Sequence, residues 1–163
     1  MNTVEVVNAY NSLGIMHQEL GDLSTARADL EQGLNLAQDI GDEEGQAYLL
    51  SNLGLVIRDL GQLESANRLL TEGLAIVRAL NNEHQVSFFL SYLSTVSLEA
   101  GSLEQAIDQA HQALALRQKL DLELRTTDDL ATLAAAHLAG GDSNQALKYA
   151  EQALAILDEC GGE

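Results

Sequence analysis

Apolar residues recur three and four positions apart along the whole chain, which is the spacing of helices that bury one face. In residues 45–84, one apolar stripe runs from Leu49 to Leu60 and a second runs from Leu63 to Val77. Gly61 separates the two stripes, and glycine readily adopts the left-handed backbone that often follows a helix end. The pattern therefore predicts pairs of helices joined by short turns, and no strands.

The same pattern recurs every forty residues without a gap, and a fixed period of this length is typical of repeat architectures. We expect an all-α fold of eight helices in four antiparallel pairs, forming a single domain with approximate repeat boundaries at 5–44, 45–84, 85–124 and 125–163. Four columns are identical in all four rows: Leu13, Leu53, Leu93, Leu133; Gly21, Gly61, Gly101, Gly141; Ala26, Ala66, Ala106, Ala146; and Leu34, Leu74, Leu114, Leu154.

Small residues also recur inside the predicted helices, at Gly14, Gly33, Gly54 and Gly73. Glycine within a helix costs roughly 0.5–1 kcal/mol relative to alanine. We therefore expect close helix crossings at these positions, where packing offsets that cost.

Polar residues at the predicted helix starts indicate how the helices are capped. Asn2, Asn82, Ser102 and Asp142 each precede a Glu or Gln by three residues, which is the spacing of a capping box. Acidic runs at 42–44 and 128–129 come near predicted first-helix starts, where they would favour the helix dipole. Steering of a basic partner is the alternative explanation for these runs.

Composition and charge exclude several function classes. Twenty-five acidic residues against eight basic ones give a net charge of −17, so nucleic-acid and anionic-membrane partners are disfavoured. The chain has no apolar run long enough to span a bilayer and no signal-like start, and we expect a cytoplasmic protein.

The chain shows no catalytic or metal-binding motif. Its four histidines are dispersed, and no glycine-rich segment carries the Lys and Ser/Thr of a phosphate-binding loop. The single cysteine, Cys160, shares a column with Ile40, Leu80 and Leu120, which favours a core position. We predict no enzyme activity, no cofactor and no metal.

The motifs Leu13-Gly14 and Gly21-Asp22-Leu23, followed by Ala26 and Gly33, resemble the tetratricopeptide repeat. The period of forty departs from the usual thirty-four, and the usual proline near the end of the second helix is absent. The chain is similar to the long-repeat subclass found in Pins-type adaptors, kinesin light chains and the sensor arms of bacterial signalling proteins. The resemblance implies an α-solenoid with a right-handed superhelix and a protein-binding role.

In the resembled family, the first helix of each repeat lines a concave groove that binds the partner. Among the groove positions that the resemblance implies, Tyr48, Phe88 and Tyr92 offer large contact areas. The amides of Asn11 and Asn52 can pair with a peptide backbone, and the Arg58 guanidinium suits a carboxylate. Packing between neighbouring first helices is an alternative role for Tyr48 and Phe88. The implied groove residues are Asn11, Tyr48, Asn52, Arg58, Phe88 and Tyr92. Ser51 and Leu55 stand where a chaperone-binding clamp needs Lys and Asn, which disfavours that mechanism.

The final predicted helix, from Ala146 onward, is apolar nearly all round, although a terminal repeat should be polar on its outer side. This pattern predicts that the chain is a fragment of a longer array. It also predicts self-association through an exposed strip, end to end or as a symmetric dimer. The strip includes Leu147, Leu154 and Leu157.

The function that the sequence favours is a non-catalytic protein–protein interaction module, which binds a peptide or partner helix in the concave groove. Its protein or peptide partner should be basic or neutral, because the chain is strongly acidic. The alternative is a ligand- or peptide-sensing regulatory arm of a larger bacterial signalling or transcription-regulating protein.

Overall fold

The computed structural model of the chain describes residues 2–161, apart from the side chains of residues 160 and 161. The expectation for Cys160 therefore lies outside the described part. Every regular element within residues 2–161 is an α-helix, which confirms the predicted all-α class. The helices are α1 (Thr3–Glu19), α2 (Leu23–Ile40), α3 (Glu43–Asp59), α4 (Leu63–Ala79), α5 (Glu83–Glu99), α6 (Leu103–Lys119), α7 (Glu123–Ala139) and α8 (Ser143–Gly161).

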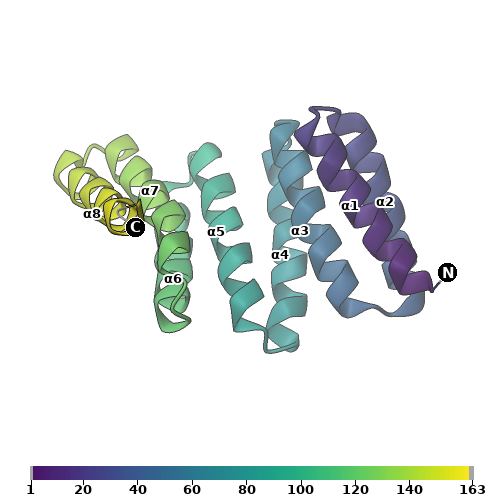
Figure 1. Cartoon of the computed structure of the whole chain (residues 1–163). Coiled ribbons are helices and arrows are strands. Elements are labelled where there is room, and N and C mark those ends of the chain that lie inside the picture. Colours follow the sequence, from purple (N-terminus) through teal and green to yellow (C-terminus); the bar gives the residue numbers. More distant parts are fainter. Residues whose placement is uncertain (1, 162–163) are drawn as a thin grey trace. The chain divides into compact units, whose positions relative to one another are not determined.

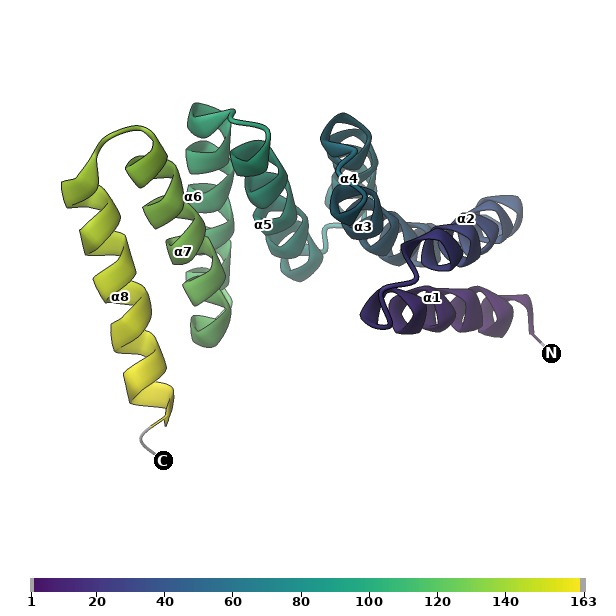
Figure 2. The same cartoon turned by 90° about the horizontal axis from the view of Figure 1, so that it is seen from above.

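The helices form two compact units, Met1–Asn81 and Asn82–Glu163, with two helix pairs in each. In the first unit α1 packs on α2, α2 on α3 and α3 on α4, and α1 also contacts α3 (Figure 1). In the second unit α5 packs on α6, α6 on α7 and α7 on α8, and α5 also contacts α7 (Figure 2). The first helices of the repeats thus lie side by side within each unit. We call this surface the first-helix face, formed by α1 and α3 in one unit and by α5 and α7 in the other.

A residue with left-handed backbone follows the helix both at the turns within a helix pair and at the turns between pairs. Gly61 follows the first helix of its pair with φ at +76°, and the same column is left-handed in every repeat. The next amide, of Gln62, donates to the carbonyl of Ile57 at 3.0 Å and closes the helix end. After second helices, Asn81 and Asp121 take φ of 53° and 54°. Asn and Asp adopt the left-handed backbone more readily than other residues with a side chain, because their short polar side chains can hydrogen-bond locally.

Most of the predicted caps are present. Asn2 and Glu5 form a complete capping box, and the Asn82 side chain accepts from the amide of Gln85 at 3.1 Å. Asp142 accepts from the amide of Gln145 at the same distance. The prediction for Ser102 is wrong, because its side chain makes no capping hydrogen bond. The first turn of α6 therefore depends on its packing rather than on a side-chain cap.

Helix crossings within the pairs match large residues to small ones. A Cβ added to Gly54 would lie 2.8 Å from the Cγ and Cδ2 atoms of Leu70, and Gly14 faces Leu30 in the same way. Nothing can be added at such a crossing unless the opposite side chain gives way. In the third and fourth rows, Ser94 and Ala134 replace the glycine while Ala110 and Ala150 replace the leucine. The large residue is therefore lost in the rows where the glycine gains a side chain.

This matching predicts that substitutions at Gly54 and Leu70 are coupled. Gly54→Ala should destabilise by about 1–3 kcal/mol through overpacking, and Leu70→Ala by about 2–5 kcal/mol through a cavity. The double variant reproduces the Ala134/Ala150 pair, so its loss should be well below the sum of the two single losses. Denaturant unfolding of the four proteins measures this coupling, and strictly additive losses would show that the two side chains do not share the crossing.

Candidate functional site

Two side-chain amides join the helices of the first unit's first-helix face. Asn52 Nδ2, on α3, donates to Asn11 Oδ1, on α1, at 2.7 Å. Further along, Gln18 Nε2 donates to Asp59 Oδ2 at 2.8 Å. The two amides predicted to pair with a peptide backbone are therefore bonded to each other. This hydrogen bond does not involve Asn52 Oδ1 or Asn11 Nδ2.

The other predicted residues of the first unit lie on α3. Tyr48 stands one helical turn before Asn52 and is 52% exposed, so its ring is open to a partner. Arg58 donates to Asp59 through Nε at 3.1 Å and through Nη2 at 2.7 Å. Its guanidinium, predicted to bind a partner's carboxylate, thus engages the carboxylate of the neighbouring residue.

A row of aromatic rings runs along α5 in the second unit. The Phe88 ring centroid lies 5.0 Å from that of His84 and 6.4 Å from that of Tyr92. The residues are four positions apart, so their side chains follow one face of the helix. Phe88 and Tyr92, both predicted from the sequence, therefore lie together, and His84 extends the row.

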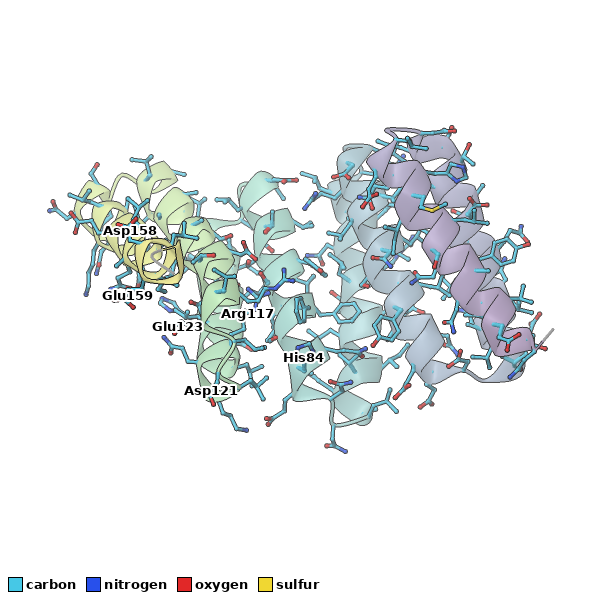
Figure 3. The ribbon with its side chains drawn as sticks, in the orientation of Figure 1. His84, Arg117, Asp121, Glu123, Asp158 and Glu159 are labelled. Atoms are coloured by element: carbon cyan, nitrogen blue, oxygen red, sulfur yellow. The ribbon has the colours of Figure 1, made fainter. Side chains whose placement is uncertain are left out.

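Two guanidinium groups contact the Phe88 ring. The Cζ atom of Arg117, on α6, lies 5.1 Å from the ring centroid, and that of Arg125, on α7, lies 5.7 Å from it. Both distances suit cation–π attraction. Figure 3 labels His84 and Arg117, which both contact this ring. Phe88 is half-buried and packs against the next helix pair, so the alternative packing role holds for part of its surface.

Arg117 also forms a buried ion pair with Asp129 between α6 and α7. Its Nη1 lies 2.9 Å from Asp129 Oδ2 and donates to the carbonyl of Arg125. The two residues are 1% and 0% exposed. The expectation that residues 128–129 mark a helix start is wrong, because both lie in the interior of α7. Asp129 balances a buried cation instead of the helix dipole.

The ion pair is incompletely satisfied. Arg117 Nε and Asp129 Oδ1 are buried without a hydrogen-bond partner among the described residues. Burial raises the pKa of Asp129 to about 6, although the neighbouring Arg117 charge favours its ionised form. The carboxyl is therefore ionised at neutral pH and protonates in mild acid.

The sequence contained a signal for this pair that motif searching missed. Arg117 occupies the column of Ala37 and Val77, and Asp129 occupies the column of Leu49 and Phe89. Two opposite charges in otherwise apolar columns, twelve residues apart, indicate a contact between one second helix and the next first helix.

The two histidines that share a repeat column each contact a residue of the second helix in their own pair. His17 Nδ1 lies 2.7 Å from Asp29 Oδ2, and the His137 ring stacks on Tyr149 with centroids 5.5 Å apart. In the third row the same two columns hold Ser97 and Gln109, whose polar atoms lie 2.8 Å apart. These contacts hold helix pairs together and do not converge on a shared cavity.

Two hollows lie in the second unit. Figure 3 labels Asp121 in the turn before α7, Glu123 at the start of α7, and Asp158 and Glu159 near the end of α8. One hollow, of about 250 Å³, is lined by Gln118, Asp121, Glu123, Thr126 and Ile156. The other, of about 330 Å³, is almost wholly apolar and is lined by Ala134, Ala135, Leu138, Ser143, Ala146, Leu147 and Ala150.

Within residues 2–161, no group of three or more His, Cys, Asp or Glu side chains could hold a metal ion. None of the helices described is both long and apolar enough to cross a lipid bilayer.

The apolar strip predicted for the last helix lies on the surface of α8. Leu147 is 59% exposed, Leu154 is 60% exposed and Leu157 is 47% exposed. The three residues follow one another at intervals of seven and three positions, so they share one side of the helix.

A family model described as tetratricopeptide repeat matches residues 5–79. No curated protein gives a significant match. Among solved structures, BtubC (BKLC) from P. vanneervenii is similar over 100% of this chain and 67% of its own, with a TM-score of 0.90 at 22% identity. The apo form of RapI has a TM-score of 0.91 at 15% identity, over 99% of this chain and 59% of its own. MamA has a TM-score of 0.74 at 16% identity, over 96% of this chain and 81% of its own.

These structural similarities, at such low identities, concern the fold. They agree with the helical-repeat architecture described above.

The buried pair predicts a strong coupling between Arg117 and Asp129. Asp129→Leu should destabilise by about 3–5 kcal/mol, because it strands a buried guanidinium. Adding Arg117→Met should recover most of this loss, since the equivalent positions between α2 and α3 hold the apolar Ala37 and Leu49. Chemical denaturation of the wild type, both single variants and the double variant measures the coupling. A double variant as unstable as Asp129→Leu would contradict it.

The raised pKa predicts a pH dependence of defined sign. Because the folded pKa of Asp129 is about 6 and its ordinary value is 3.8, the folded state keeps a proton that the unfolded chain has lost. The carboxyl's contribution to stability therefore grows as the pH falls through 6 and is lost as the pH rises through 6. The free energy of unfolding of the wild type, minus that of Arg117→Met/Asp129→Leu, should rise on acidification. A difference that falls instead would mean that Arg117 lowers the pKa of Asp129 below its ordinary value.

Proposed function

Because this chain is a tetratricopeptide-repeat protein, with the family match over residues 5–79, we propose that it is a non-catalytic module that binds a protein partner on its first-helix faces. The observation that carries the proposal is the gathering of aromatic and amide side chains on these faces. Tyr48, Phe88 and Tyr92 are three of only six aromatic residues in the chain. Aromatic side chains of this kind are enriched at protein interfaces, where they supply large contact areas.

The amide pair of the first unit suits an extended peptide. Asn52 Oδ1 can accept from a peptide N–H, and Asn11 Nδ2 can donate to a peptide carbonyl. Their mutual hydrogen bond holds both amides in one orientation, which reduces the entropy lost when a peptide binds. Tyr48, one turn away and exposed, offers a ring against which a partner side chain can pack.

The net charge of −17 favours a partner that is basic or neutral. A field of this sign accelerates the approach of a basic peptide, and the rate falls as salt screens the charge. The side chains proposed to contact the partner are mostly uncharged aromatic rings and amides, whose contacts salt does not screen. We therefore expect added salt to lower the association rate more than it raises the dissociation rate.

The proposal predicts that two substitutions weaken binding without unfolding the chain. Random peptides displayed on phage would be selected on the immobilised wild-type chain, and their affinities then measured against variants. Asn52→Ala should weaken binding about tenfold, since it removes hydrogen bonds worth about 1 kcal/mol or more. Tyr92→Ala should weaken binding of the peptides that contact the second unit, and the helical content should stay unchanged in both variants.

A matched control lies away from the first-helix faces. Asn144→Ala, at an exposed position of α8, should leave peptide affinity unchanged. Selected peptides that bind equally well to the Asn52 and Tyr92 variants would overturn the proposal. Failure to select any peptide, together with a thermal shift caused by a small metabolite, would favour the alternative of a ligand-sensing regulatory arm.

A further inference from the structure

Arg125, in the first turn of α7, carries a guanidinium that is not paired with a carboxylate of the chain. Its Cζ atom lies 5.7 Å from the Phe88 ring centroid. Among the residues that the structure describes, the Arg125 side chain makes no hydrogen bond or ion pair. Contact with the face of a ring occupies none of the guanidinium's N–H donors. The donors of this exposed side chain are therefore available to a partner.

Two arginines close to the same faces are already paired. Arg117, which contacts the same ring, bonds to the carboxylate of Asp129 and to the carbonyl of Arg125. Arg58, on the first-helix face of the first unit, bonds to Asp59. The chain has 25 acidic residues and eight basic ones, so carboxylates are plentiful. The unpaired state of Arg125 therefore reflects its surroundings rather than a shortage of anions.

The carboxylates best spaced to pair with Arg125 are directed at Arg117 instead. Asp128 and Asp129 lie three and four positions further along α7, the separations at which helical side chains meet. Asp129 is buried against Arg117, at 2.9 Å from its Nη1. Asp128 Oδ2 lies 4.0 Å from the same Nη1 atom. Arg125 is thus left to an anion from outside the chain.

The imidazole of His84 adds a second polar group at the Phe88 ring. The two ring centroids lie 5.0 Å apart, and His84, labelled in Figure 3, is exposed. Its ring nitrogens form no hydrogen bond with the described part of the chain. A guanidinium fork matches the two oxygens of a carboxylate, and an imidazole N–H can donate to one of them. We call Arg125 and His84, at the Phe88 ring, the Phe88 anchor.

We propose that the Phe88 anchor binds the side-chain carboxylate of an Asp or Glu within the partner peptide. This inference rests on the proposed function, because it names the chemistry that the first-helix face of the second unit selects. Arg125 is the main contact, and His84 supplies a second donor. One acidic residue is compatible with a partner that is basic or neutral overall.

The aromatic row favours a carboxylate within the peptide over one at its C-terminus. Rings lie on both sides of Phe88, with His84 one helical turn before it and Tyr92 one turn after it. A peptide that packs along this row continues past Arg125 in either direction. The carboxylate that reaches the guanidinium then belongs to a side chain.

Peptide selection tests the anchor. Random peptides displayed on phage would be selected on the wild-type chain, and those that Tyr92→Ala weakens would be synthesised with free and with amidated C-termini. These peptides should share an Asp or Glu at one aligned position. Changing that residue to Asn or Gln should weaken binding about tenfold or more, as should Arg125→Gln. On Arg125→Gln the acidic and amide peptides should bind equally, because the two changes remove the same contact.

Arg68→Gln is the matched control, since it removes the same charge at an exposed position of α4 and should leave affinity unchanged. Circular dichroism should show the same helical content in both variants. Peptides that depend on Tyr92 but lack a shared acidic residue, or bind Arg125→Gln as tightly as the wild type, would overturn this inference alone. So would peptides that need a free C-terminus, or a selection that yields peptides for the first unit only. Peptides indifferent to both Tyr92→Ala and Asn52→Ala would instead overturn the proposed function itself.

Discussion

A helix pair of this repeat cannot bury all its apolar surface by itself, and the rest of the structure depends on how that surface is covered. Within a pair, the crossing of Gly54 on Leu70 leaves no space between the helices. Between pairs, Leu34 and Ala37 are buried because α3 lies over them. The equivalent columns are more exposed on α1 and α8, where Met16 is 51% exposed and Leu154 is 60% exposed.

This constraint accounts for how far the sequence predicts the fold. Columns such as Gly61 and Ala66 face the same turn or crossing in each row, so their identity predicts a left-handed turn and a close contact. The contacts between different columns were not predictable from single columns. The bond from Asn52 to Asn11 and the pair of Arg117 with Asp129 each join two columns that carry no shared identity.

The candidate site was predicted to a similar degree. Phe88 and Tyr92 were named from their repeat positions, and the structure places their rings in one row with His84. The contacts of the Arg117 and Arg125 guanidinium groups with the Phe88 ring were not predicted, because these two residues lie on other helices, α6 and α7. A residue's repeat position shows which face it belongs to, whereas its neighbours on that face depend on helices that are distant in sequence.

Hydrogen–deuterium exchange of the wild type and of Leu49→Ala tests most directly the claim that each helix pair is stabilised by the helix that covers it. The account predicts that removal of the buried Leu49 side chain, which packs at Gly33 on α2, speeds exchange in both α2 and α3. Faster exchange that is confined to α3, or unchanged exchange in both helices, would contradict it.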